Sequence, residues 1–176
     1  MGFWWKYSEL ISPYSKSQYN KLNVFMIPSE PDLKRVASTM HTQRVLRIPT
    51  RGKSLHKITD QIREVVADSR VTMGVCSIFV RHTSASLLIQ ENADPDVLAD
   101  LETFFETLVP EGRNYRHSME GPDDMPAHIR SALTHTSEQI PISQGQLTLG
   151  TWQGIYLWEH RQRSQTRTVV VHILGG

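Results

Sequence analysis

Two kinds of apolar repeat follow one another along this chain, and their order is what most constrains its fold. The run from Thr72 to Arg81 is apolar and β-branched, as in a strand, whereas the apolar residues after Pro95 recur at helical spacing. Strand-like runs lie next to one another, and helices interrupt them without a regular strand–helix–strand unit. This order favours an α+β fold with a mainly antiparallel sheet.

The same patterns predict individual elements. Asp94 followed by Pro95 predicts the start of a helix, because a carboxylate cap and a proline at the first helical position both favour one. Turns between paired strands are expected at Gln144-Gly145 and at 163–165. Strands are expected at 43–48, 72–81, 87–91, 139–142, 146–149, 154–158 and 168–174, and helices at 55–66, at 95–109 and from Pro126, the last with Ile129, Ala132 and Leu133 facing inward.

Composition excludes several classes of protein. The formal net charge is +1, and basic residues are scattered among acids, so we expect neither a nucleic acid nor a membrane as partner. No apolar run approaches the roughly 20 residues of a membrane-spanning helix. The single cysteine, Cys76, excludes an internal disulfide, and its apolar surroundings favour a buried side chain over a nucleophile. We expect a cytoplasmic protein.

The first 39 residues differ from the rest of the chain. They are rich in Ser, Tyr, Asn and Lys, contain three prolines and show no clear period. We expect a loosely ordered N-terminal extension followed by one domain at 40–176. An organelle-targeting segment is the alternative, although no arginine precedes Arg35 and no amphipathic helix pattern is present.

His82 is the first candidate for chemistry. Strand alternation places it on the same face as Cys76 and Ile78, so it lies at the rim of a buried surface. Thr83 and Ser84 follow it directly. A histidine there can act as acid, base or metal ligand. A structural histidine, bonded to a turn carbonyl at the edge of the core, is an equally weighted alternative.

Polar residues also cluster where the predicted strand at 87–91 ends. Asp94 has a sufficient structural role as a helix cap, although a helix N-terminus can also bind a phosphate. Glu91 and Asn92 have no such structural explanation and are better candidates for a site.

The segment 117–128 contains two histidines and three acids within one loop and the following helical turn. Nitrogen and oxygen ligands of this kind suit zinc or a related divalent ion. The spacing matches no standard zinc signature. Asp123 or Asp124 can instead cap the helix that begins near Pro126, and the acids can be a solvated loop.

The segment 150–161 adds a third group of candidates. Alternation places Gln153, Glu159 and Arg161 on one side of a strand. Glu159 and Arg161 can simply pair with each other, or the guanidinium can bind a phosphate or carboxylate. The aromatic residues of this segment favour packing or an interface.

Together these blocks resemble the YjbQ family, small proteins known as a secondary type of thiamine-phosphate synthase. The resemblance covers about residue 41 to the end. It implies a compact α+β fold with an antiparallel, sandwich-like sheet, assembled as a homotrimer. The matching segments are 82–86, 91–95, 115–117, 120–128 and 150–161.

The activity that the resemblance implies joins a hydroxymethylpyrimidine diphosphate to a thiazole phosphate, with release of pyrophosphate. The small phosphorylated substrates would lie between a wall formed by residues 82–92 and a second wall from the segment 117–128. A non-catalytic trimeric module that binds a small anionic metabolite or a metal is the alternative. The expected residues are His82, Glu91, Asn92 and Glu120 in catalysis, Thr83, Ser84, Asp94, Gln153 and Arg161 in substrate binding, and His117, His128 and Asp123 as ligands of a divalent ion, Mg²⁺ or Zn²⁺.

Overall fold

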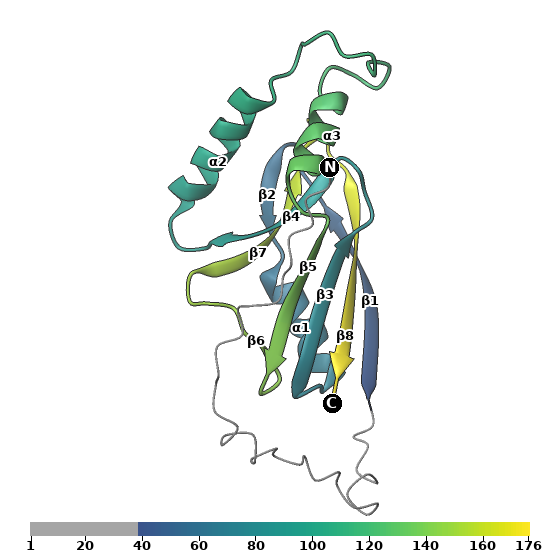
Figure 1. The fold of residues 1–176 in the computed structure, drawn as a ribbon, viewed down its shortest axis with the longest axis vertical. Helices are drawn as coiled ribbons and strands as arrows, with labels where there is room; N and C mark the ends of the chain where they lie inside the picture. The colour runs from purple at the N-terminus through teal and green to yellow at the C-terminus, as the bar shows by residue number, and fades with distance from the viewer. Residues whose placement is uncertain (1–38) are drawn as a thin grey trace, which may run out of the picture. The chain divides into compact units, whose positions relative to one another are not determined.

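The computed structural model describes residues 39–176, which fold into two antiparallel sheets and three helices (Figure 1). The N-terminal extension expected at 1–39 lies outside the described residues, apart from its last position. The elements are β1 (Met40–Pro49), β2 (Ser54–Lys57), α1 (Thr59–Ser69), β3 (Met73–Val80), β4 (Ala85–Glu91), α2 (Pro95–Leu108), α3 (Asp124–Leu133), β5 (Ser137–Ser143), β6 (Gln146–Leu147), β7 (Gln153–Glu159) and β8 (Thr166–Gly175).

The larger sheet has the strand order β1-β8-β3-β5-β6, and the smaller one has the order β2-β7-β4. Every named strand pairing in both sheets is antiparallel. The prediction of an α+β fold with mainly antiparallel sheet is therefore confirmed.

The core lies between the two sheets and α1. Alternation along β3 sends Cys76, Ile78 and Val80 inward, and all three are buried. The inner face of α1 contributes Ile62 and Val66, and the smaller sheet adds further apolar residues to the same cluster. Burial raises the pKa of the Cys76 thiol to about 12, which agrees with its expected role as a packed side chain.

Of the predictions for strands and turns, the helix expected from Leu55 and the hairpin expected at 163–165 differ from the structure. Leu55, expected in a helix, lies in β2, which pairs with β7 about a hundred residues later in the chain, a pairing that no local pattern reveals. The turn at Gln144-Gly145 joins β5 and β6 as expected, with positive φ at both residues. The segment 163–165 instead connects β7 and β8, which belong to different sheets, so the predicted hairpin there is wrong.

The prediction for the inner face of α3 is also wrong. Ala127, Arg130 and Ser131 are buried, whereas Leu133 is 56% exposed. The three buried residues stand at i, i+3 and i+4 and therefore share one helical face. A polar residue can occupy such a face when it is hydrogen-bonded, as the Ser131 hydroxyl is when it donates to the Ala85 carbonyl.

Helix α2 begins as predicted, with the Asp94 carboxylate accepting a hydrogen bond from the Asp96 amide. The helix lies at the outer edge of the domain, beyond the smaller sheet (Figure 1). None of its residues is buried, although it carries an apolar stripe. No helix within residues 39–176 is long and apolar enough to cross a membrane.

Candidate metal centre

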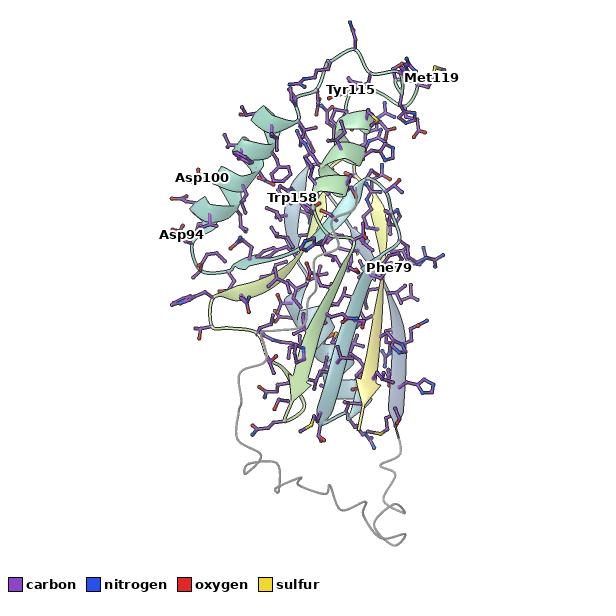
Figure 2. All side chains as sticks on the ribbon, viewed as in Figure 1. Phe79, Asp94, Asp100, Tyr115, Met119 and Trp158 are labelled. Carbon is purple, nitrogen blue, oxygen red and sulfur yellow. The ribbon has the colours of Figure 1, made fainter. Side chains whose placement is uncertain are left out.

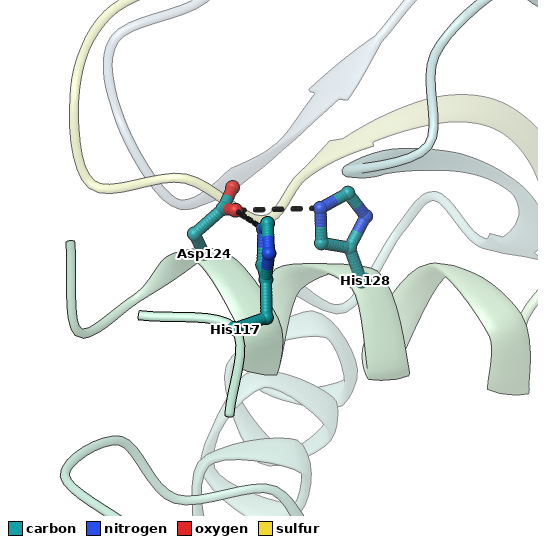
Figure 3. A group of neighbouring side chains, drawn as sticks. All are labelled: His117, Asp124 and His128. Atoms are coloured by element: carbon teal, nitrogen blue, oxygen red, sulfur yellow. Dashed lines mark hydrogen bonds and ion pairs between the residues drawn. The ribbon is translucent and has the colours of Figure 1, made fainter. Parts of the chain in front are cut away.

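Three potential metal ligands converge at the start of α3. Asp124 Oδ2 lies 2.6 Å from His117 Nε2 and 3.4 Å from His128 Nε2. One ligand atom from each residue lies within 4.8 Å of the others, and the side chains point toward one another (Figure 3). The structure thus brings together the two histidines that the sequence assigned to a metal.

Local geometry explains this convergence. Asp124 and His128 stand four residues apart on α3, so both project from the same helical face. The loop before the helix brings in His117. Gly121 has a φ of 113°, in the region that favours glycine, which lets the loop turn sharply into Asp123 and the first residues of α3.

His128 is oriented by a hydrogen bond to the backbone. Its Nδ1 lies 2.9 Å from the Thr83 carbonyl oxygen, and only an N–H can donate to that acceptor. Nδ1 therefore carries a proton, and this bond holds the ring with Nε2 toward Asp124. Metal-ligating histidines are oriented by such a bond from the other ring nitrogen.

Arg161 holds the carboxylates of this region. Its Nε donates to Asp123 Oδ2 at 3.0 Å, its NH1 group pairs with Asp124 Oδ1, and its NH2 group donates to the Glu120 carbonyl. Asp124 Oδ1 is thus fixed by the guanidinium, while Oδ2 faces the histidines. The carboxylate side chain of Asp124 is almost fully buried, whereas the histidines are partly open to solvent.

The sequence predicted Asp123 as the acidic metal ligand, but the carboxylate that faces the histidines is that of the next residue, Asp124. Asp123 Oδ2 accepts hydrogen bonds from Arg161 and from the Gln162 amide. Burial alone would raise the pKa of Asp123, but these hydrogen bonds outweigh it and hold the pKa below its usual value. The structure therefore places Asp124, not Asp123, in the candidate ligand set.

The Arg161 guanidinium is likewise bonded to groups of this chain. Burial alone would lower its pKa, but the paired carboxylates, Asp123 first among them, raise it. It contacts acids of this chain, and not Glu159 as the strand alternation suggested. The guanidinium is thus occupied by groups of this chain, and the substrate-binding role expected for Arg161 stays a prediction. The Glu120 side chain lies 3.9 Å from this guanidinium and is largely exposed.

His82 directly precedes Thr83, whose carbonyl accepts the hydrogen bond from His128. His82 Nε2 accepts a hydrogen bond from the Thr168 amide at 2.8 Å, so this nitrogen is occupied by the backbone. Burial and the adjacent Arg167 lower the pKa of His82. The His82 ring is thus bonded to a backbone amide, closer to the structural alternative. The carbonyls of Thr83 and Ser84 accept hydrogen bonds from His128 and Arg167.

The remaining candidates lie at the far end of β4. Seven residues at ~3.3 Å each separate Ala85, beside α3, from Glu91 by about 20 Å. Within one copy of the domain, residues 82–92 therefore do not form a single wall opposite the metal centre. The polar groups at that far end bond locally: Glu91 to the Ala93 amide, Asn92 to the Gln153 carbonyl, Asp94 to the Asp96 amide and Gln153 to the Gly150 amide.

A buried ion pair supports this part of the domain and was missed from the sequence. Glu159 is fully buried and pairs with Arg167, and it also accepts a hydrogen bond from the Thr50 hydroxyl at 2.7 Å. No local spacing signals this pair, because the two residues lie on strands of different sheets.

A pocket of about 280 Å³ adjoins the metal centre through His117. The loop that supplies His117 forms the pocket, so a molecule in it would contact one of the three candidate ligands. The lining residues are Gly112, Arg113, Tyr115, His117, Ser118, Gly121 and Pro122.

Comparison with known proteins identifies relatives of this domain. Residues 44–176 match the family model described as UPF0047 protein YjbQ-like. UPF0047 protein sll1880 of Synechocystis sp. is 66% identical over 134 residues, which are 76% of this chain and 91% of that protein. UPF0047 protein YjbQ of Escherichia coli O157:H7 is 42% identical over 137 residues, 77% of this chain and 99% of that protein.

Solved structures show the same fold. A YbjQ-like protein of unknown function from Sulfolobus solfataricus P2 superposes with a TM-score of 0.69 at 27% identity, over 77% of this chain and 99% of that one. An uncharacterised conserved protein of the YjbQ/UPF0047 family from Clostridium acetobutylicum gives a TM-score of 0.66 at 37% identity, over 75% of this chain and 98% of that one.

These relatives correct one expectation and establish another. The relatives are described only as UPF0047 proteins or as proteins of unknown function, and none indicates an activity related to thiamine. The predicted thiamine-phosphate synthase activity is therefore wrong as the function of this family. The matched family model spans most of the chain and the relatives are aligned over nearly their full length, so the chain belongs to the YjbQ-like UPF0047 family.

Proposed function

We propose that this protein is a divalent-metal-dependent enzyme whose ion is held by His117, Asp124 and His128. The observation that supports this most directly is the hydrogen bond from His128 Nδ1 to the Thr83 carbonyl, which turns Nε2 toward Asp124. Metal-ligating histidines are oriented in this way, by a bond from the other ring nitrogen to a backbone carbonyl. Arg161 contributes by fixing the opposite carboxylate oxygen.

The donor set favours a transition-metal ion. Imidazole nitrogens suit zinc and iron, whereas Mg²⁺ prefers oxygen ligands and water. Of the two ions expected from the sequence, Zn²⁺ therefore fits better. Three protein ligands leave one position of a tetrahedral ion for water or substrate, which is typical of catalytic sites. When bound, such an ion acts as a Lewis acid or lowers the pKa of its water.

The adjoining pocket suggests the class of substrate. Arg113 offers a guanidinium, and Tyr115 and Ser118 offer hydroxyls, beside His117. These groups suit the phosphate of a small phosphorylated molecule, with the rest of the molecule in the pocket. The geometry favours reaction at the phosphate or next to it, where the ion would be closest.

Metal titration tests the proposal. Protein stripped with a chelator and dialysed should bind one equivalent of Zn²⁺ by calorimetry, and inorganic phosphate should bind more tightly to the zinc-loaded protein than to the stripped protein. His128→Ala and Asp124→Asn should each weaken zinc binding about tenfold or more, because the first removes a ligand and the second replaces an anionic ligand with a neutral amide.

A matched control uses a histidine outside the centre. His135 pairs with Glu138 on the surface, so His135→Ala should leave zinc binding unchanged. Equal zinc binding by the wild type, His128→Ala and His135→Ala would show that the ion binds elsewhere and would overturn the proposal.

We further propose that the domain assembles as a homotrimer. The outer face of the larger sheet exposes Val45, Phe79 and Leu174, and α2 exposes Phe104 and Leu108. Large contiguous apolar surfaces mark interaction sites in soluble proteins. The side chain of Phe79 is labelled on the larger sheet in Figure 2.

Light scattering coupled to size-exclusion chromatography measures this assembly. A trimer should have three times the mass of the chain, and Phe79→Lys or Phe104→Asp should shift it toward a monomer. A monomeric wild-type protein at micromolar concentration would contradict the proposal.

A further inference from the structure

A second polar cavity lies between α2, α3 and β7, away from the metal centre. Its volume is about 50 Å³, and its lining residues are Lys53, Glu102, Glu106, Arg130 and Trp158. On α3, Arg130 follows His128 by two residues, so the two side chains project about 200° apart around the helix. The cavity and the metal centre thus use different faces of the same helix.

Arg130 is a buried cation that pairs with no carboxylate of residues 39–176. It is 5% exposed, its NH2 group donates to the Val109 carbonyl at 3.0 Å, and its Nε has no hydrogen-bond acceptor. Within residues 39–176, no carboxylate oxygen lies within 4.0 Å of it. Leaving a buried charge unpaired costs several kcal/mol in real proteins. A ligand that supplies a carboxylate would remove that cost.

Glu102 lines the same cavity with the opposite charge. Burial, and then the neighbouring Glu106, raise the pKa of the Glu102 carboxyl, while the Leu55 amide and Lys53 partly offset them. No cation of the described chain lies within 4.0 Å of Glu102. Lys53 pairs instead with Glu111 at 2.8 Å and with Glu106, the other acid of the cavity, at 3.5 Å. Among the described residues, a cation and an anion that each lack an oppositely charged partner therefore line one small space.

Trp158 supplies an aromatic wall. Its ring packs edge-on against Phe105 of α2, with the ring centroids 4.8 Å apart, and Figure 2 shows it between α2 and the sheets. A water needs about 10–15 Å³ of such space, so the cavity holds roughly three to five groups of that size. The ammonium, Cα and carboxylate of an α-amino acid form a group of that size.

We propose that this cavity binds the zwitterionic head group of a small α-amino acid. Arg130 takes the carboxylate and Glu102 takes the ammonium, with Trp158 against the carbon atoms. A lone anion fits less well because it would meet the carboxylates of Glu102 and Glu106. A lone cation fits less well because Arg130 would stay unpaired. A zwitterion pairs both charges and leaves the net charge of the cavity unchanged.

Calorimetric titration of the purified full chain with matched probes tests this proposal. Glycine and alanine should bind, whereas acetate, which lacks the ammonium, and glycinamide, which lacks the carboxylate, should each bind about tenfold to a hundredfold more weakly. Acetate that binds as tightly as glycine would show a simple anion site and overturn the proposal. Absence of binding by every probe would show a water-filled cavity and overturn it as well.

Variants separate the site from its surroundings. Arg130→Met and Glu102→Gln should each weaken glycine binding about tenfold or more, and Glu102→Gln does so without removing the Arg130 contact to Val109. Glu64→Gln, an exposed change on α1, should bind glycine as the wild type does. His117→Ala should also retain glycine binding, which keeps this test independent of the metal centre. Undiminished binding by Glu102→Gln would overturn the assignment of the ammonium site.

Discussion

Replacing Glu159 with Gln should strongly destabilise the domain. The Glu159 carboxylate is fully buried and receives hydrogen bonds from Arg167, from the Thr50 hydroxyl and from the Arg161 amide. Glutamine keeps the shape and one acceptor oxygen but removes the negative charge. The Arg167 guanidinium, itself only 4% exposed, would then be a buried charge without a counterion.

The magnitude follows from that burial. Breaking a buried ion pair by removing one partner costs about 3–5 kcal/mol, because the remaining charge is uncompensated. In a chain of this length, 1 kcal/mol shifts the melting temperature by roughly 2–4 °C. We therefore expect Glu159→Gln to lower the melting temperature by roughly 6–20 °C.

Urea unfolding followed by circular dichroism measures the loss, at fixed protein concentration because assembly shifts apparent stability. Glu159→Leu combined with Arg167→Met should recover much of the loss, since replacing both charges with apolar side chains removes the unpaired group. A loss below about 1 kcal/mol in Glu159→Gln would refute the reasoning, because a surface pair is worth no more than that.

Three further predictions concern other parts of the domain. Cys76 should resist Ellman's reagent in the native protein at pH 8, because its thiol is buried with a pKa of about 12, and rapid native labelling would contradict its burial. Burial lowers the pKa of His160 to about 3 in the folded protein, whereas the same side chain in the unfolded chain binds a proton as the pH falls below about 6.5. The free energy of unfolding should therefore decrease by roughly 2 kcal/mol between pH 6.5 and 5 because of this site. Urea unfolding of His160→Phe should show a flatter pH dependence. Asp94→Ala should lose about 1 kcal/mol in urea unfolding with zinc binding unchanged, because the Asp94 carboxylate caps α2 far from the metal centre.

The fold was predictable where the sequence pattern is local. The strand from Met73 to Val80 alternates inward and outward in phase with the core, and the Asp94-Pro95 pair marks the start of α2. What could not be predicted depends on partners distant in sequence. The short strand β2 exists because it pairs with β7, and nothing within its four residues requires that pairing.

The candidate site follows the same division. Two histidines in one loop-and-helix segment indicated a metal, and the structure places His117 and His128 together. The choice between Asp123 and Asp124 was open to a finer argument: Asp124 stands four residues before His128 and shares its helical face. The ion pairs of Arg161 with Asp123 and Asp124 could not be predicted, because they join the residues after β7 to the start of α3, almost forty residues apart in sequence.

A crystal structure of the zinc-loaded protein, measured at the zinc absorption edge, tests the central claim most directly. We predict one anomalous peak with His117 Nε2, His128 Nε2 and Asp124 Oδ2 each about 2.0–2.2 Å away, and with the His128 Nδ1 bond to Thr83 retained. A peak coordinated by other residues, or none at this centre in fully loaded protein, would contradict the account.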